Sequence, residues 1–186
     1  TRRPPALPMG RAQLVPPPGS FLQATAAGEA ALLSAVRDIT AGATRVLDLF
    51  AGCGTFSLPL AETAEVHAVE GLSAPLQALD AAARRTPGLH RITTETRDLS
   101  RRPLLPDELD YNAIVIDPPR AGAEAQAREI ARIGSAKLAW ASCDPVTFAR
   151  DARILAEGGW AMSRLFVIDQ FRWSPHVETV AEFRRS

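Results

Sequence analysis

The stretch that decides the fold is Val46-Leu-Asp-Leu-Phe-Ala-Gly-Cys-Gly-Thr-Phe56. It opens on a short apolar run, Val46, Leu47 and Leu49, which is typical of a strand buried on both faces of a parallel sheet. Glycines and the first residues of a helix follow directly. This order favours an open α/β sheet, in which ligands bind at the carboxyl ends of the strands.

The glycine turn is where we expect a cofactor. Gly52 and Gly54 allow the backbone to turn tightly and to approach a ligand with no side chain in the way. Thr55 can cap the helix that begins at Phe56. Glycines spaced in this way also occur in purely structural turns, so the turn alone does not define a binding site.

An acidic residue, Glu70, ends the second expected strand, Glu65–Glu70. A carboxylate at this position accepts hydrogen bonds from both ribose hydroxyls of a nucleoside cofactor. Leu58 stands where the third glycine of a dinucleotide motif would fall, and no lysine follows the glycines as in a P-loop. A nucleoside without a pyrophosphate fits better, and S-adenosylmethionine is the commonest. The alternative for Glu70 is a solvated strand end.

The next two expected strands also end in acidic residues. Asp98 follows the third strand, Leu89–Thr94, and either faces an adenine amino group or serves as a turn or cap residue. Asp117 follows the fourth strand, Tyr111–Ile116, and two prolines come directly after it. These prolines stop the strand and stiffen the loop, which suits a wall that faces a substrate.

The loop Asp117-Pro-Pro-Arg-Ala-Gly122 raises a second possibility. A related Asp/Asn-Pro-Pro-aromatic pattern occurs in enzymes that methylate amino nitrogens, where the aromatic ring stacks on the substrate. Arg120 stands at the aromatic position in this chain, which departs from that pattern.

Cys143 lies just beyond the fifth expected strand, Ala136–Ala141, and a helix is expected to start near Pro145. A helix N-terminus lowers the pKa of a nearby thiol and so favours the reactive thiolate. We therefore interpret Cys143 as a candidate nucleophile. Cys53 has no base near it in the sequence, and we interpret it as a small residue that fills the glycine turn.

The last two expected strands, Trp160–Asp169 and Val177–Phe183, form a hairpin around Phe171–Pro175. His176 and Glu178 are two residues apart, so on a strand their side chains would face the same side. Either could act as a general base, or the pair could be a polar surface patch. His176 has no second ligand near it, so we predict no metal.

The composition limits the classes of protein to which the chain can belong. With 186 residues, 46% of them hydrophobic, one domain with a sizeable core is expected. The formal net charge is zero, so the overall basic signature of many nucleic-acid binders is absent, although local clusters such as Arg84-Arg85 remain. Two cysteines suggest a reducing, cytoplasmic setting. The sequence shows no signal peptide and no long apolar run, so we predict neither export nor membrane insertion.

The amino-terminal segment differs in composition from the rest. Residues 1–18 are rich in proline and predict an extended lead-in or linker rather than packed structure. We assign residues 19–186 to one domain. An alanine-rich helix is expected from Thr25 to Ile39, and others over Ala74–Arg85 and Thr147–Leu155.

Taken together, the motifs resemble the RNA uracil-5-methyltransferases, which depend on S-adenosylmethionine and make 5-methyluridine in tRNA or rRNA. The matching stretches run in the family's order from residue 19 almost to the end. They are Gly19-Ser-Phe-Leu-Gln23, Leu47-Asp-Leu-Phe-Ala-Gly-Cys-Gly-Thr-Phe-Ser57, Val69-Glu70, Asp117-Pro-Pro-Arg-Ala-Gly122, Ser142-Cys-Asp-Pro145 followed by Thr147 and Ala149-Arg-Asp151, and His176-Val-Glu178.

The resemblance implies a fold, a mechanism and a set of site residues. The fold is a Rossmann-like class I methyltransferase, α/β, with a seven-stranded, mostly parallel sheet, helices on both faces and an antiparallel hairpin at the edge. Cys143 would be the nucleophile that forms a covalent adduct with uracil, and Glu178 the base. The residues around the cofactor would be Gln23, Phe50, Thr55, Glu70, Asp98 and Asp117.

Three positions depart from the family pattern, which usually has Asn where Thr25, Thr55 and Asp144 stand. Asp144 places a negative charge beside Cys143, which should raise the pKa of the thiol. The family also carries an RNA-binding part before this domain, which we expect to be missing here. Two alternatives therefore stay open: an amino-nitrogen methyltransferase and a non-catalytic module that binds RNA.

Overall fold

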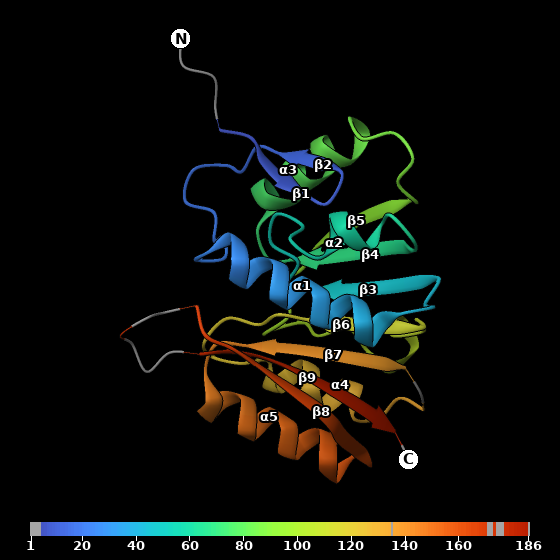
Figure 1. Cartoon of the computed structure of the whole chain (residues 1–186). Coiled ribbons are helices and arrows are strands. Elements are labelled where there is room, and N and C mark those ends of the chain that lie inside the picture. The colour runs from blue at the N-terminus through green and yellow to red at the C-terminus, as the bar shows by residue number, and fades with distance from the viewer. Residues whose placement is uncertain (1–4, 135, 171–172, 174–176, 186) are drawn as a thin grey trace.

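A seven-stranded sheet in the order β5-β4-β3-β6-β7-β9-β8 forms the centre of the computed structural model (Figure 1). The structure describes residues 5–134, 136–170, 173 and 177–185. Five strands are parallel, and β9 pairs antiparallel with β7 and β8. The strand bounds are β3 Arg45–Leu49, β4 Glu65–Glu70, β5 Ile92–Thr96, β6 Ala113–Ile116, β7 Lys137–Ser142, β8 Trp160–Ile168 and β9 Glu178–Arg185.

The central strands are buried on both faces because helices cover both sides of the sheet. All four residues of β6 are fully buried, and Val46, Leu47 and Leu49 of β3 are at most 1% exposed. Helices α1, α2 and α3 lie on one face, and α4 and α5 on the other. Their bounds are α1 Ala26–Thr40, α2 Ser57–Leu60, α3 Ser73–Arg84, α4 Glu124–Ile130 and α5 Pro145–Glu157.

Each face has its own packed cluster. Leu32, Val36 and Ile39 of α1 pack with Val46 and Val115 on one side of the sheet. On the other side, the apolar residues of α4 and α5 pack against alternate residues of the same strands, among them Leu47, Ile114 and Trp140. Within the described segments, no helix is long and apolar enough to cross a membrane.

The predicted architecture is confirmed, including the antiparallel hairpin at the sheet edge. The second strand has the expected bounds, whereas the third begins at Ile92 rather than Leu89 and the fourth at Ala113 rather than Tyr111. Neither α4 nor the 3-10 helix η1 (Pro106–Glu108) was expected. Apart from Trp173, the predicted hairpin tip lies outside the described residues.

The expectation that Thr55 caps the helix after the glycine turn is wrong. Helix α2 begins at Ser57, its N-cap is Phe56, and no side chain caps it. The helix is only four residues long and all four are buried, so packing rather than capping determines where it begins.

The expectation that residues 1–18 lack packed structure is also wrong. Strands β1 (Leu7–Met9) and β2 (Ala12–Leu14) form an antiparallel hairpin that lies against α3 (Figure 1). Met9, Ala12 and Leu14 are at most 2% exposed and join the same apolar cluster as Leu79. The sequence did not predict the hairpin because prolines, such as those at positions 8 and 16, favour a linker over a strand.

Replacing Leu14 by alanine tests whether the hairpin belongs to the core. A fully buried leucine costs about 2–5 kcal/mol when it is cut to alanine, because apolar contacts are lost and a cavity remains. We expect the free energy of unfolding, measured in urea, to fall by an amount in this range for Leu14→Ala. Gln13→Ala, at the exposed neighbouring position of β2, should change it by less than about 0.5 kcal/mol. Equal effects of the two variants would contradict the packing.

Candidate active site

Four parallel strands, β3, β4, β6 and β7, end at the same edge of the sheet, and the predicted site residues follow their ends. Phe50 follows β3, Glu70 ends β4, Asp117 follows β6 and Cys143 follows β7. Glu178 begins the antiparallel strand β9, so it also lies at this edge. Segments far apart in the sequence therefore meet in one place.

The turn after β3 has an unusual backbone. Phe50 adopts a φ of 60°, a left-handed conformation that costs a residue with a Cβ about 1–3 kcal/mol. Gly54 has a φ of 92°, and a Cβ there would lie 2.7 Å from the Leu79 side chain, so only glycine fits. At Gly52 nothing lies within 4 Å of the position a Cβ would take. The turn is thus packed against α3 at Gly54 and open at Gly52.

Glu70 is joined to this turn by hydrogen bonds. Its Oε2 atom accepts one from Gly52 N at 3.1 Å, and its Oε1 atom accepts one from Leu72 N at 3.1 Å. A carboxylate beside an open glycine turn is the combination that a ribose and its nucleoside require. The residues at this edge therefore fit a nucleoside cofactor.

Asp98 lies close to Glu70 along the backbone, because Arg97 N donates a hydrogen bond to Glu70 O at 2.9 Å. The Asp98 side chain is 53% exposed, and its Oδ1 atom accepts hydrogen bonds from Ser100 N at 3.0 Å and Arg101 N at 3.3 Å. This is the turn role that was the alternative for Asp98. The other oxygen, Oδ2, makes an exposed ion pair with Arg101 Nε at 3.6 Å, which is too long for a hydrogen bond, so Oδ2 can still accept one.

The segment before α1 is tied to the end of β8. Gln23 Oε1 accepts a hydrogen bond from Gln170 Nε2 at 2.9 Å. Thr25 is the N-cap of α1, and its Oγ1 atom accepts a hydrogen bond from Gly28 N at 3.0 Å. Threonine can therefore provide here the capping bond that an asparagine would make.

Asp48, a residue that sequence reasoning missed, lies beneath the glycine turn. Its side chain is fully buried, and burial raises the pKa of the carboxyl to about 7. Oδ2 accepts a hydrogen bond from Ser57 Oγ, whereas Oδ1 has no partner in the described part of the chain. The signal was an acidic residue inside an apolar strand, because such a group is costly unless it has a use.

The loop from Asp117 to Gly122 is fastened to α5. Three hydrogen bonds hold it: Thr147 Oγ1 donates to Arg120 O at 3.0 Å, Arg150 Nη2 donates to Ala121 O at 3.0 Å, and Ala123 N donates to Asp151 Oδ2 at 2.7 Å. Asp151 is fully buried, so its loss would leave a buried N–H without an acceptor. Its role was also missed, because nothing in the sequence links Asp151 to a loop so far before it.

Cys143 and Glu178 are brought together by the pairing of β7 with β9. Ser142 pairs with Thr179 in antiparallel register. The residue after Ser142, Cys143, therefore lies opposite the residue before Thr179, Glu178. Glu178 is only 4% exposed, and burial raises the pKa of its carboxyl. Cys143 is partly buried.

The pKa of the Cys143 thiol is raised by burial first, and then by the negative charges of Glu178 and Asp117. The positive charge of Arg120 acts in the opposite direction. The sequence suggested that Asp144 raises the pKa of the thiol, but Asp144 is not among the groups that do so. Its Oδ1 atom accepts hydrogen bonds from Val146 N at 2.9 Å and Thr147 N at 3.0 Å, so it caps α5.

Two residues discussed in the sequence do not join this group. His176 lies outside the described residues, so its place as an alternative base is not tested. Cys53 is buried among apolar residues of the glycine turn and α3. Among the residues described, no three of His, Cys, Asp and Glu gather to form a metal site.

The sheet order, the glycine turn and the acidic end of β4 define the class I, Rossmann-like methyltransferase fold. A solved structure with this fold is a tRNA (uracil-54, C5)-methyltransferase from Pyrococcus abyssi in complex with S-adenosyl-L-homocysteine. It superposes with a TM-score of 0.82 at 23% identity, over 96% of this chain and 43% of that one.

Sequence comparison identifies the family. The profile of the tRNA (uracil-5-)-methyltransferases matches residues 88–185, just over half of the chain. An uncharacterized RNA methyltransferase from Rhizobium meliloti is 51% identical over 97% of this chain. The 23S rRNA (uracil(1939)-C(5))-methyltransferase RlmD from Chromohalobacter salexigens is 39% identical over 88% of it.

The chain belongs to the tRNA (uracil-5-)-methyltransferase family. It spans less than half the length of the curated relatives it matches, 44% of the Rhizobium protein and 34% of the Chromohalobacter protein. The resemblance seen in the motifs is thereby confirmed, at the level of a catalytic domain.

The raised pKa of Asp117 predicts how stability depends on pH. Burial, and then the charges of Glu178 and Asp48, raise the pKa of Asp117 from 3.8 to about 7. The folded state therefore holds this proton more tightly than the unfolded state, and stability falls as the pH rises from about 4 through 7. Asn cannot ionise, so the stability of Asp117→Asn relative to the native chain should rise by about 2–3 kcal/mol between pH 5 and pH 8.

Urea unfolding at the two pH values measures this gain. Asp107→Asn is the matched control, because Asp107 is an exposed carboxylate in η1, and it should show the pH trend of the native chain. A gain for Asp117→Asn that is the same at pH 5 and pH 8 would refute the raised pKa of Asp117.

Proposed function

We propose that this chain is the catalytic domain of an RNA methyltransferase that transfers a methyl group from S-adenosylmethionine to carbon 5 of a uridine. The observation that carries the proposal is the meeting of Cys143, Glu178 and Asp117 at the sheet edge beside the glycine turn. A nucleophile, a base and a cofactor turn are the three parts that this chemistry needs. Membership of the family supports it.

Cys143 supplies the nucleophile. Carbon 5 of uracil is a poor nucleophile, but addition of the Cys143 thiolate to carbon 6 breaks the double bond between carbons 5 and 6 and pushes its electrons toward the O4 carbonyl. The resulting enolate makes carbon 5 nucleophilic. When bound, S-adenosylmethionine supplies the electrophilic methyl group that carbon 5 takes up, and it leaves as S-adenosylhomocysteine.

Glu178 supplies the base. After methylation, carbon 5 carries both its proton and the methyl group, and a base must remove the proton before the Cys143 sulfur can leave carbon 6. Burial raises the pKa of Glu178, which strengthens it as a proton acceptor. Elimination restores the double bond and the free thiolate.

Asp117 is placed to hold the uracil as well as to line the cofactor site. Its raised pKa of about 7 means that a proton is available at neutral pH, so the carboxyl can donate one hydrogen bond and accept another. Uracil offers an O4 acceptor and an N3–H donor next to each other. The stiff Pro118-Pro119 backbone and the contacts to α5 keep this carboxyl in position.

We assign the cofactor residues from the resemblance to the family, and the geometry of Glu70 and Asp98 supports the assignment. Glu70 would accept hydrogen bonds from the ribose hydroxyls, and Oδ2 of Asp98 would accept one from the adenine amino group. Phe50, Gln23 and Thr55 would line the remaining sides.

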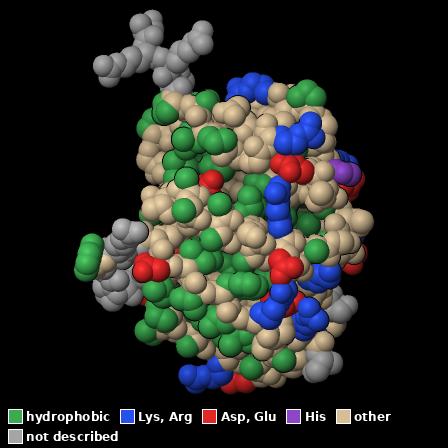
Figure 2. Space-filling view, in the orientation of Figure 1, with side chains coloured by type: hydrophobic (Ala, Val, Ile, Leu, Met, Phe, Trp, Pro, Cys, Tyr) green, Lys and Arg blue, Asp and Glu red, His purple; other side chains and the backbone are tan. Residues whose placement is uncertain are grey.

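The substrate is RNA, either rRNA or tRNA. One relative with a specific name acts on 23S rRNA and one solved structure is of a tRNA enzyme. A paired uridine must leave its stack before Cys143 can reach carbon 6, at a cost of a few kcal/mol. The chain spans less than half of its relatives and has no net charge, with acidic side chains among the basic ones on the face seen in Figure 2, so we place much of the RNA grip in a separate part of the protein. A cytoplasmic location accords with this substrate and stays a prediction.

RNA that contains 5-fluorouridine tests the nucleophile. Fluorine at carbon 5 cannot leave as a proton does, so the methylated adduct should stay attached to Cys143. We expect a covalent protein–RNA complex on a denaturing gel when the full-length protein is given S-adenosylmethionine and this RNA. Cys143→Ala should form none, and Cys53→Ala should form it as the native protein does.

The same gel, together with the identity of the methylated nucleoside in the RNA, separates the alternatives. An amino-nitrogen methyltransferase needs no thiol, so it would give an N-methylated base and no adduct. A binding module would give neither product. With ordinary uridine RNA, Glu178→Gln should accumulate the adduct, because the carbon 5 proton then has no acceptor.

The pH dependence of methylation tests the charges around the thiol. Since the pKa of Cys143 is raised, the thiolate fraction and the single-turnover rate should increase as the pH rises above 7. Arg120→Gln removes the cation that lowers this pKa, so the rate at pH 7 should fall by about three- to tenfold and partly recover at higher pH. Arg120→Lys should restore most of the rate.

Asp144→Asn is the control for this experiment. Asparagine keeps the cap of α5, so its pH profile should stay within about 0.3 pH units of the native one. A shift as large as that of Arg120→Gln would show that Asp144, rather than Glu178 and Asp117, opposes the thiolate.

A further inference from the structure

The connection between β5 and β6 leaves part of one sheet face uncovered. Residues 97–112 contain only the short 3-10 helix η1, whereas parallel strands are usually joined by an α-helix that lies on the sheet. On this face Leu49 and Val69 are buried toward the carboxyl ends of the strands. Nearer the amino ends, the side chains on the same face are polar.

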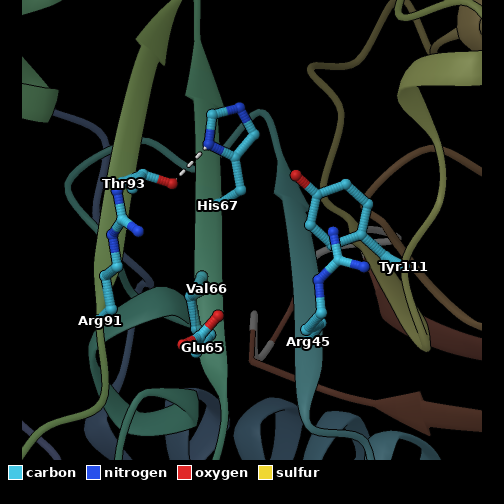
Figure 3. A pocket seen from close by; sticks show the side chains of 7 residues that line it. All are labelled: Arg45, Glu65, Val66, His67, Arg91, Thr93 and Tyr111. Atoms are coloured by element: carbon cyan, nitrogen blue, oxygen red, sulfur yellow. Dashed lines mark hydrogen bonds between the residues drawn. The ribbon is translucent and has the colours of Figure 1, made fainter.

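These polar side chains form rows across three strands. Arg45 of β3 pairs with Glu65 of β4, and the register of β4 with β5 places Arg91 beside Glu65. The next row holds His67 and Thr93, which are paired residues. With Tyr111 they line an open pocket of about 240 Å³ (Figure 3).

Several of the groups in the pocket are held in fixed positions. His67 Nδ1 is 2.8 Å from Thr93 Oγ1, and the dashed line in Figure 3 marks this bond. The His67 ring is nearly parallel to the Tyr111 ring, at 9° and with the centroids 6.3 Å apart. The Arg45 guanidinium lies 4.9 Å from the centre of the Tyr111 ring. The Arg45 guanidinium is thus stacked on the Tyr111 ring, which in turn stacks with the His67 ring.

Two arginines, Arg45 and Arg91, bring positive charge to the pocket. Within the described residues Arg91 makes no ion pair, and Arg45 has only Asp110, which is 3.6 Å away and 94% exposed. An exposed pair of this kind contributes little, so both guanidinium groups are available.

We propose that this pocket binds a nucleotide of the RNA substrate at a point distant from the target uridine, an inference that rests on the proposed function. Arg91 and Arg45 hold the phosphate, because a guanidinium offers paired donors that match its oxygens. Glu65, between the two arginines, accepts a hydrogen bond from the ribose 2′-hydroxyl, the group that distinguishes RNA from DNA.

The size and place of the pocket favour a polymer over a free metabolite. Its volume is below the range of roughly 300–1,000 Å³ that is usual for small-molecule sites, so it suits one unit of a chain that continues beyond it. It lies at the opposite end of β4 from Glu70, and the five residue steps from Glu65 to Glu70 span about 17 Å. An RNA that reaches both places is gripped at two ends of the sheet.

Reversing the charge of Arg91 tests the proposal in the full-length protein. Filter binding with unmodified transcripts of 23S rRNA and of tRNA should show that Arg91→Glu weakens binding of the preferred RNA by about tenfold. The slope of log affinity against log salt should fall by about one, as for one lost phosphate contact. Arg153→Glu is the matched control, because Arg153 is also exposed and has no ion pair in the described residues, and its affinity should stay within about twofold of native.

Equal affinities of Arg91→Glu and Arg153→Glu would overturn the proposal. So would loss of thermal stability in Arg91→Glu without a change in RNA binding, since the pocket would then hold another part of the protein. If millimolar uridine monophosphate binds the native protein but not Arg91→Glu, while the two proteins bind RNA equally well, the pocket binds a free nucleotide instead. Binding does not require methylation, so Arg91-dependent binding without 5-methyluridine would keep this inference and refute the proposed reaction.

Discussion

The repulsion among three acidic groups at one end of the sheet is the constraint on which the site depends. Burial raises the pKa of Asp117, of Glu178 and of the Cys143 thiol. The charge of Glu178 raises those of Asp117 and Cys143 further, and the charge of Asp117 also raises that of Cys143. The scaffold must hold them together against this repulsion. It does so with a continuous β7–β9 pairing, which sets Cys143 opposite Glu178, and with one cation, Arg120, that faces the group.

Rigid attachment of the loop that carries Asp117 and Arg120 follows from the same need. A flexible loop would let the like charges move apart and take up water. Prolines restrict the loop from within, and the side chains of α5 hold it from outside through Thr147, Arg150 and Asp151. Helix α5 in turn begins at the Asp144 cap, directly after Cys143. Cys143, helix α5 and the Asp117–Gly122 loop are thus held in fixed positions relative to one another.

Much of this could be predicted from the sequence, because apolar strands followed by polar residues are local signals. The position of Glu70 next to the glycine turn and that of Cys143 at a strand end required only the rule that parallel strands end together. Contacts between distant segments could not be predicted. The anchoring by Asp151 depends on α4, which was not expected, and the Leu7–Leu14 hairpin was hidden because prolines suggested a linker where tertiary packing prevails. Asp48 was overlooked because its apolar neighbours dominated the strand pattern.

The left-handed backbone at Phe50 has a consequence for the timing of energetic costs. A turn that had to adopt this conformation when a ligand arrived would subtract the strain of about 1–3 kcal/mol from every binding event. Here the conformation is already present, fixed by the Ala51–Val69 hydrogen bond of 3.1 Å and by the close packing of Gly54 on Leu79. The strain is therefore incurred once, when the chain folds, and it is absent from each catalytic cycle.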